Sequence, residues 1–140
     1  MDGSDKYFYY YNFDLKKTIL IDYTGKSIYE FDGKDIKFVV KTGSYTNDLI
    51  YVEYSGKYMI INPDNLNVIY DSNEKITLLD DGIYKKDRFY YIYDDETYYP
   101  FDAKNVTLVD KYKKVLKIEV SDTEVYYHDI INNSKLDDYV

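Results

Sequence analysis

Apolar and aromatic residues fall in short runs along this chain, and polar turns separate the runs. The segments KYFYYYNFD, LIYVEY and RFYYIY are dense in aromatic and β-branched residues, which favour strands. Asp32-Gly33, Ser55-Gly56 and Asp80-Asp81-Gly82 are turn signals between such runs. The pattern therefore predicts an all-β chain of short antiparallel strands.

The pattern of apolar and turn positions repeats. The pairs Phe31-Asp32, Tyr70-Asp71 and Val109-Asp110 follow one another at a spacing of 39 residues. Upstream the spacing is 40, so that Tyr11, Lys17, Ile21 and Ile28 match Tyr51, Lys57, Ile61 and Val68. A period in this range is typical of supersecondary units that stack or are arranged radially.

The spacing predicts a single all-β repeat domain over residues 1–140. Three four-stranded repeats are expected at about 7–48, 49–87 and 88–124, followed by a partial fourth at 125–131 and a polar tail at 132–140. We expect a propeller-like antiparallel meander. A β-trefoil is the alternative, because three copies of four strands would also close a trefoil.

Four segments add detail to this prediction. Residues 111–120 carry both a helical and an alternating pattern, and the repeat register favours a strand. Pro100 lacks an amide donor, so the strand in TYYPF is expected at an edge or a bulge. The segment EVYYHDII is expected to be the first strand of the fourth copy. In LIYVEY apolar residues occupy both alternating sets, which predicts a strand covered on both faces.

Segments such as KYMIINPDNLNVIYD and TILIDYTGKSIYEFD resemble bacterial WG repeats, in which an aromatic-glycine pair precedes a short strand, a turn and an aromatic-Asp pair. The similarity covers roughly three copies, from Tyr7 to Val120. The chain has no Trp, and most of the repeat glycines are replaced. The resemblance implies an all-β repeat module without an established chemistry.

The composition narrows the classes of partner. The net charge of −8 disfavours nucleic acid and anionic lipid and favours a basic partner. Cysteine is absent, which excludes disulfides and thiolate zinc sites. The apolar runs are too short to span a bilayer, so no membrane insertion is expected. A cytoplasmic location is expected if Met1 is the native start, and a secreted or cell-surface one if the chain is trimmed.

No residue pattern predicts catalysis. His128, the only histidine, lies beside Asp129 without a nucleophile motif, and a structural role is expected. Arg88, the only arginine, is expected to pair with Asp87 or a Tyr ring. The acidic turns lack the spacing of a calcium loop. We therefore expect no enzyme, no metal site and no cofactor.

The 21 Tyr residues give the one positive indication of function. Neighbouring Tyr residues in a strand point to opposite faces, so one ring of each pair is expected at the surface, where Tyr makes rigid contacts with proteins. The expected binding residues, at which the copies differ, are Asp94, Asp95, Glu96, Tyr98, Tyr99, Tyr127 and His128.

Three functions remain open. The first is a non-catalytic protein-interaction module with a Tyr-rich acidic β surface, which could also form a homo-oligomer through its edge strands. The second is a carbohydrate-binding domain, which requires a row of coplanar rings. The third is an acidic immunity or inhibitor protein, which requires a carboxylate patch around Asp80, Asp94 and Asp95.

Overall fold

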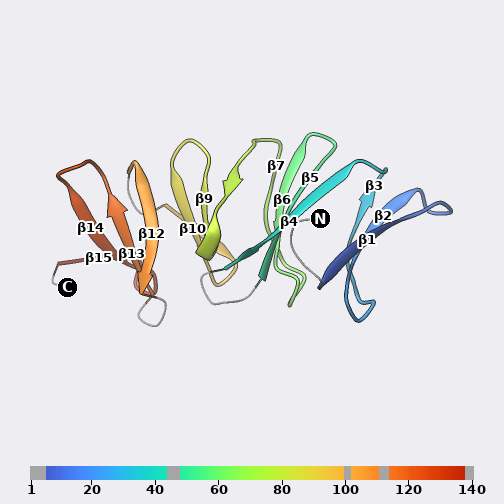
Figure 1. Ribbon diagram of the computed structural model, residues 1–140, viewed down its shortest axis with the longest axis horizontal. Helices are drawn as coiled ribbons and strands as arrows, with labels where there is room; N and C mark the ends of the chain where they lie inside the picture. Colours follow the sequence, from blue (N-terminus) through green and yellow to red (C-terminus); the bar gives the residue numbers. More distant parts are fainter. Residues whose placement is uncertain (1–5, 44–47, 100–101, 111–113, 138–140) are drawn as a thin grey trace. The chain divides into compact units, whose positions relative to one another are not determined.

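The computed structural model describes residues 6–43, 48–99, 102–110 and 114–137, which are mostly strands joined by tight turns (Figure 1). The first seven strands are β1 (Tyr7–Asn12), β2 (Lys17–Asp22), β3 (Ser27–Asp32), β4 (Ile36–Thr42), β5 (Asp48–Tyr54), β6 (Lys57–Ile61) and β7 (Val68–Ser72). The next four are β8 (Thr77–Leu78), β9 (Ile83–Lys85), β10 (Phe89–Tyr93) and β11 (Glu96–Tyr98), with a short 3-10 turn, η1 (Asp80–Gly82), before β9. The last four are β12 (Asn105–Asp110), β13 (Val115–Glu119), β14 (Val125–Asp129) and β15 (Ser134–Leu136).

These strands form four antiparallel sheets, and each sheet is a meander in chain order. The sheets are β1-β2-β3, β4-β5-β6-β7, β8-β9-β10-β11 and β12-β13-β14-β15. The predicted all-β meander is therefore confirmed. None of the four sheets closes into a barrel, so the described strands give no support to the trefoil alternative.

The second sheet begins one strand earlier than the expected repeat, and the third and fourth sheets begin two strands earlier. Asp32-Gly33 does turn the chain, with Gly33 at φ 87°, but it links β3 to the first strand of the next sheet rather than closing a hairpin. Likewise β12 opens the last sheet, and the segment EVYYHDII supplies its third strand instead of starting a new copy. A hairpin turn and a short link from one sheet to the next use the same turn residues. The sequence therefore does not distinguish a hairpin from a link between sheets.

The two spacings in the sequence have different structural meanings. The 40-residue spacing relates β1, β2 and β3 to β5, β6 and β7, which are the last three strands of the first two sheets. The 39-residue spacing relates Phe31-Asp32 of β3 to Tyr70-Asp71 of β7, and it also relates the hairpin β5-β6 to the hairpin β10-β11. Both have two-residue turns with positive φ at each position, Ser55-Gly56 and Asp94-Asp95. Because β5 is second in its sheet and β10 is third, the match between these two hairpins records a shared turn geometry.

The strands belong to two compact units, each with a core between its two sheets. The first unit contains β1 to β7, and the second contains β8 to β15. In the first core the buried residues are Tyr7, Leu20, Ile28, Phe31, Ile36, Phe38, Ile50, Val52, Met59 and Ile61. In the second they are Ile83, Phe89, Tyr91, Val106, Leu116, Ile118 and Ile130. Leu49, Ile50 and Val52 are all buried, as expected for a strand covered on both faces.

The C-terminal part is more regular than its polar sequence indicates. Residues 115–119 form a strand, as the repeat register predicts. Ser134–Leu136, expected in a polar tail, pairs with β14 as an edge strand. Pro100 lies outside the described residues.

Candidate functional site

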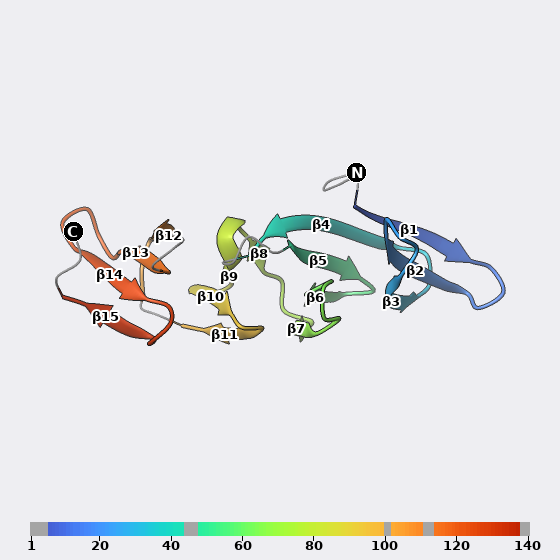
Figure 2. The same cartoon turned by 90° about the horizontal axis from the view of Figure 1, so that it is seen from below.

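The first unit has a cleft of about 720 Å³, here called the aromatic cleft. It is formed by β1, β4 and β5, and β1 and β4 lie along the same side of this unit (Figure 2). The lining residues are Phe8, Tyr9, Ile36, Lys37, Phe38, Val39, Tyr51 and Glu53.

The aromatic cleft follows the edges of strands rather than one face of a sheet. Four consecutive residues of β4 line it, and successive side chains of a strand point to opposite faces. Both β1 and β4 are outermost in their sheets. The cleft therefore places unpaired strand edges beside apolar walls.

Aromatic rings join the two edge strands across the cleft. The Tyr9 ring meets the Phe38 ring edge to face, with centroids 5.5 Å apart and planes at 86°. Tyr51 on β5 stacks on Tyr58 of β6, with centroids 6.5 Å apart. Phe8 and Tyr9 nevertheless keep 40% and 47% of their surface exposed, which leaves their rings available to a partner.

The start of β1 is fixed by Tyr7. Its hydroxyl donates to Oδ2 of Asp48 at 2.9 Å, and Asp48 also pairs with Lys6 at 3.4 Å. Burial and the nearby carboxylate of Asp48 raise the pKa of Tyr7 well above its ordinary value. The hydroxyl therefore remains a donor at neutral pH and holds β1 against β5.

The aromatic cleft has few charged groups. Lys37 and Glu53 are the charged residues of its lining. A second hollow of about 420 Å³ shares Ile36, Lys37 and Glu53 and continues to the Ser55-Gly56 turn.

The expected site residues do not form one site, and three of them build a turn. Asp94 and Asp95 occupy the β10-β11 turn at φ 52° and 61°, a conformation that Asp tolerates better than most residues. Glu96 follows and accepts a hydrogen bond from the Tyr98 hydroxyl at 3.0 Å. That bond raises the pKa of Tyr98.

Tyr99 belongs to a separate surface cluster around Arg88. The Arg88 guanidinium lies 4.5 Å from the Tyr99 ring centroid, and it pairs with Asp87 and Asp102. The expected pairing of Arg88 with Asp87 and a Tyr ring is therefore confirmed. Such exposed contacts contribute little stability each.

Tyr98 and His128 meet in the second core through Tyr91. The Tyr98 and Tyr91 rings stack at 5.2 Å, and the Tyr91 hydroxyl lies 3.2 Å from Nε2 of His128. Oδ1 of Asn133 accepts from the same hydroxyl at 2.9 Å. His128 is 3% exposed. Its neighbour Tyr127 points to the opposite face of β14, so the two do not share a surface.

Acid is expected to destabilise the protein through His128. Burial lowers its pKa, although Asn133 and Asp129 oppose the shift, so the folded state favours the neutral imidazole. An unfolded histidine has a pKa of about 6.5 and binds a proton more readily. The stabilisation is therefore complete above about pH 6.5 and is lost as the pH falls from there through the folded-state pKa.

Urea unfolding at about pH 7.5 and about pH 5.5 measures this effect. The free energy of unfolding is expected to fall by at most about 1.4 kcal/mol per pH unit for one proton. His128→Gln should be less stable at both pH values and should lose most of the difference between them. An unchanged difference in that variant would assign the pH dependence to other groups.

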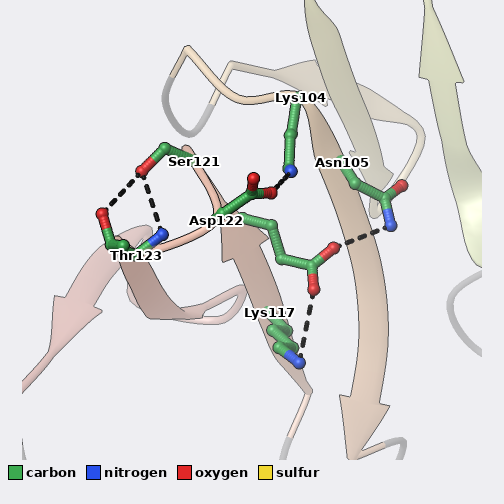
Figure 3. A network of polar contacts seen from close by, with 7 residues as sticks. Lys104, Asn105, Lys117, Ser121, Asp122 and Thr123 are labelled. Carbon is green, nitrogen blue, oxygen red and sulfur yellow. Dashed lines mark hydrogen bonds and ion pairs between the residues drawn. The ribbon is translucent and has the colours of Figure 1, made fainter.

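The polar network at the start of the last sheet is satisfied by its own members (Figure 3). Asn105 donates to Glu119 at 2.9 Å, and Lys117 lies 3.4 Å from the same carboxylate. These two contacts lower the pKa of Glu119. Lys104 forms an ion pair with Asp122. The network therefore gives this sheet a charged, mutually paired surface.

Within the described residues no group of three or more His, Cys, Asp and Glu side chains is arranged to hold a metal ion. Nor does any helix in that part of the chain have the length and apolar character needed to cross a membrane.

No family model, curated protein or solved structure matches this chain. The resemblance to WG repeats therefore stays a prediction.

Sequence reasoning did not locate the aromatic cleft, although it predicted a strand in the aromatic run KYFYYYNFD. Residues 7–12 carry no charged side chain, and this was the feature of the sequence that could have indicated a binding edge. What the sequence could not supply was the packing of two sheets that brings β1 beside β4.

Proposed function

We propose that this chain is a non-catalytic protein-interaction module that receives its partner at the aromatic cleft. The observation that carries the proposal is the coincidence of unpaired strand edges with exposed rings in that cleft. Strand edges supply backbone hydrogen bonds to an extended partner, and adjacent apolar walls accept its side chains.

The chemistry of the lining favours a protein over the other ligand classes. Exposed Tyr and Phe rings on rigid strands give contact area at low cost in conformational entropy. Tyr9 and Phe38 cross at 86° rather than lying coplanar, which argues against a platform for a sugar ring.

A charge placed in the aromatic cleft is expected to abolish partner capture. Tyr9→Lys replaces a ring that is 47% exposed with a charged side chain. The fold should tolerate the charge at this exposed position, whereas the apolar contact between Tyr9 and the partner is lost. The test is affinity capture from a lysate of the native source, with the purified chain as bait. The affinity for the captured protein should fall by at least about tenfold, as expected for the loss of one central contact.

The matched control is Tyr23→Lys, the same change at a ring that is 73% exposed in the β2-β3 turn. It should capture the same protein as the unmodified chain. Equal capture by both variants would show that the aromatic cleft is not the binding surface.

A further inference from the structure

We propose that the partner at β1 is a second copy of this chain, paired antiparallel, β1 to β1, about a two-fold axis at Tyr9. The inference rests on the proposed function and names its partner. It follows from the character of β1 as a sheet edge, from the symmetry of strand pairing and from the order of residues in this strand.

Among the described edge strands, β1 alone is both long and uncharged. It has six residues, Tyr-Phe-Tyr-Tyr-Tyr-Asn, a regular register with β2, and no other sheet neighbour in the described part of the chain. Phe8, Tyr9 and Tyr10 are 40%, 47% and 48% exposed. An edge with these properties is a template for another strand.

The other sheet edges carry features that oppose pairing. β4 has Lys37 and Lys41, β3 has Glu30 and Asp32, and β7 has Asp71. β8, β11 and β15 have only two or three residues, and β12 has a register shift beside Asp110. Charges, short length and bulges are the means by which sheets avoid association. β1 lacks all three, which selects it as the pairing edge.

Two-fold symmetry restricts the register. Neighbouring antiparallel strands are related by an axis perpendicular to the sheet, so one residue of β1 must face its own copy. With Tyr9 at the axis, Phe8 faces Tyr10 and Tyr7 faces Tyr11, so each of these five residues meets an aromatic partner. Moving the axis to Tyr10 places Asn12 opposite Phe8. Cross-strand aromatic pairs stabilise sheets, so the Tyr9 register is favoured.

Pairing at β1 also explains the aromatic cleft. Tyr9 contacts Phe38 of β4 but remains about half exposed, because nothing in the described chain lies beyond the edge of β1. An added strand in this register directs its Tyr7, Tyr9 and Tyr11 side chains to the same face as Tyr9. These rings would cover the opening of the cleft.

Cysteine cross-linking tests the partner and the register together, since the chain has no cysteine of its own. Facing residues of antiparallel strands have Cα atoms about 4.5–5.5 Å apart, within disulfide range. Under mild oxidation, Tyr9→Cys should therefore form a covalent dimer of twice 16.8 kDa. Tyr10→Cys is the control, because its two copies would lie roughly 8 Å apart, beyond that range.

Light scattering on the unmodified chain provides a second readout. Its mass should rise toward twice 16.8 kDa with concentration, and Tyr9→Lys should remain at the monomer mass. A monomer at every concentration, without cross-linking of Tyr9→Cys, would overturn the proposal. Cross-linking of Tyr10→Cys as readily as of Tyr9→Cys would overturn the register. If a strict monomer still captured another protein through Tyr9, self-pairing would fall while the proposed function stood.

Discussion

Phe31→Ala is expected to lower the free energy of unfolding by about 3–5 kcal/mol, the range for removing a buried aromatic ring. Phe31 is 1% exposed in the core of the first unit. Its ring lies 4.7 Å from the ring centroids of both Tyr29 and Tyr54. Truncation therefore removes apolar burial and two ring contacts and leaves a cavity between packed sheets.

Urea unfolding followed by near-ultraviolet circular dichroism measures this loss. Phe13→Ala is the matched control, since the same ring is removed at a position that is 75% exposed in the β1-β2 turn. The control should change the free energy of unfolding by less than about 1 kcal/mol. Equal effects of the two substitutions would mean that β3 does not pack as described.

Tyr91→Ala is expected to destabilise the second unit by about 3–5 kcal/mol, and Tyr91→Phe by about 1–3 kcal/mol. The Ala variant removes a ring that is 1% exposed and packs on Tyr98 and His128. The Phe variant keeps the ring and removes the hydroxyl shared by His128 and Asn133. Buried His128 and exposed Asn133 then lose one hydrogen bond each.

The difference between the two Tyr91 variants separates packing from hydrogen bonding. Urea unfolding at neutral pH should rank unmodified chain, Tyr91→Phe and Tyr91→Ala in order of decreasing stability. If Tyr91→Phe cost as much as Tyr91→Ala, the hydroxyl would dominate. If it cost nothing, the contacts with His128 and Asn133 would contribute no net stability.

Local patterns in the sequence predict most strands, because alternation and turn residues act over a few positions. The hairpin β5-β6 follows from Ser55-Gly56. The correspondence of β1, β2 and β3 with β5, β6 and β7 follows from matched residues 40 positions apart in the sequence. The assignment of strands to sheets did not follow. Asp32-Gly33 turns the chain in either case, and only long-range packing decides whether the next strand joins the same sheet.

The candidate site was less accessible to sequence reasoning than the fold. His128 was expected to be structural, and it lies buried beside Tyr91. Asp94 and Asp95 drew attention as acidic residues, but their place at positive φ is explained by the turn itself. The aromatic cleft combines Tyr9 with Phe38 from another sheet, and no short-range pattern reports such a contact.

The central claim is that this chain associates through the edge of β1 that has no sheet neighbour among the described residues. Amide hydrogen exchange at low and high protein concentration tests it directly, because unpaired edge amides exchange rapidly and paired ones slowly. The outward-facing amides of Tyr7–Asn12 should slow as concentration rises, while those bonded to β2 and those of the edge strand β4 remain unchanged. Rapid exchange of the outward amides of β1 at every concentration would contradict the account.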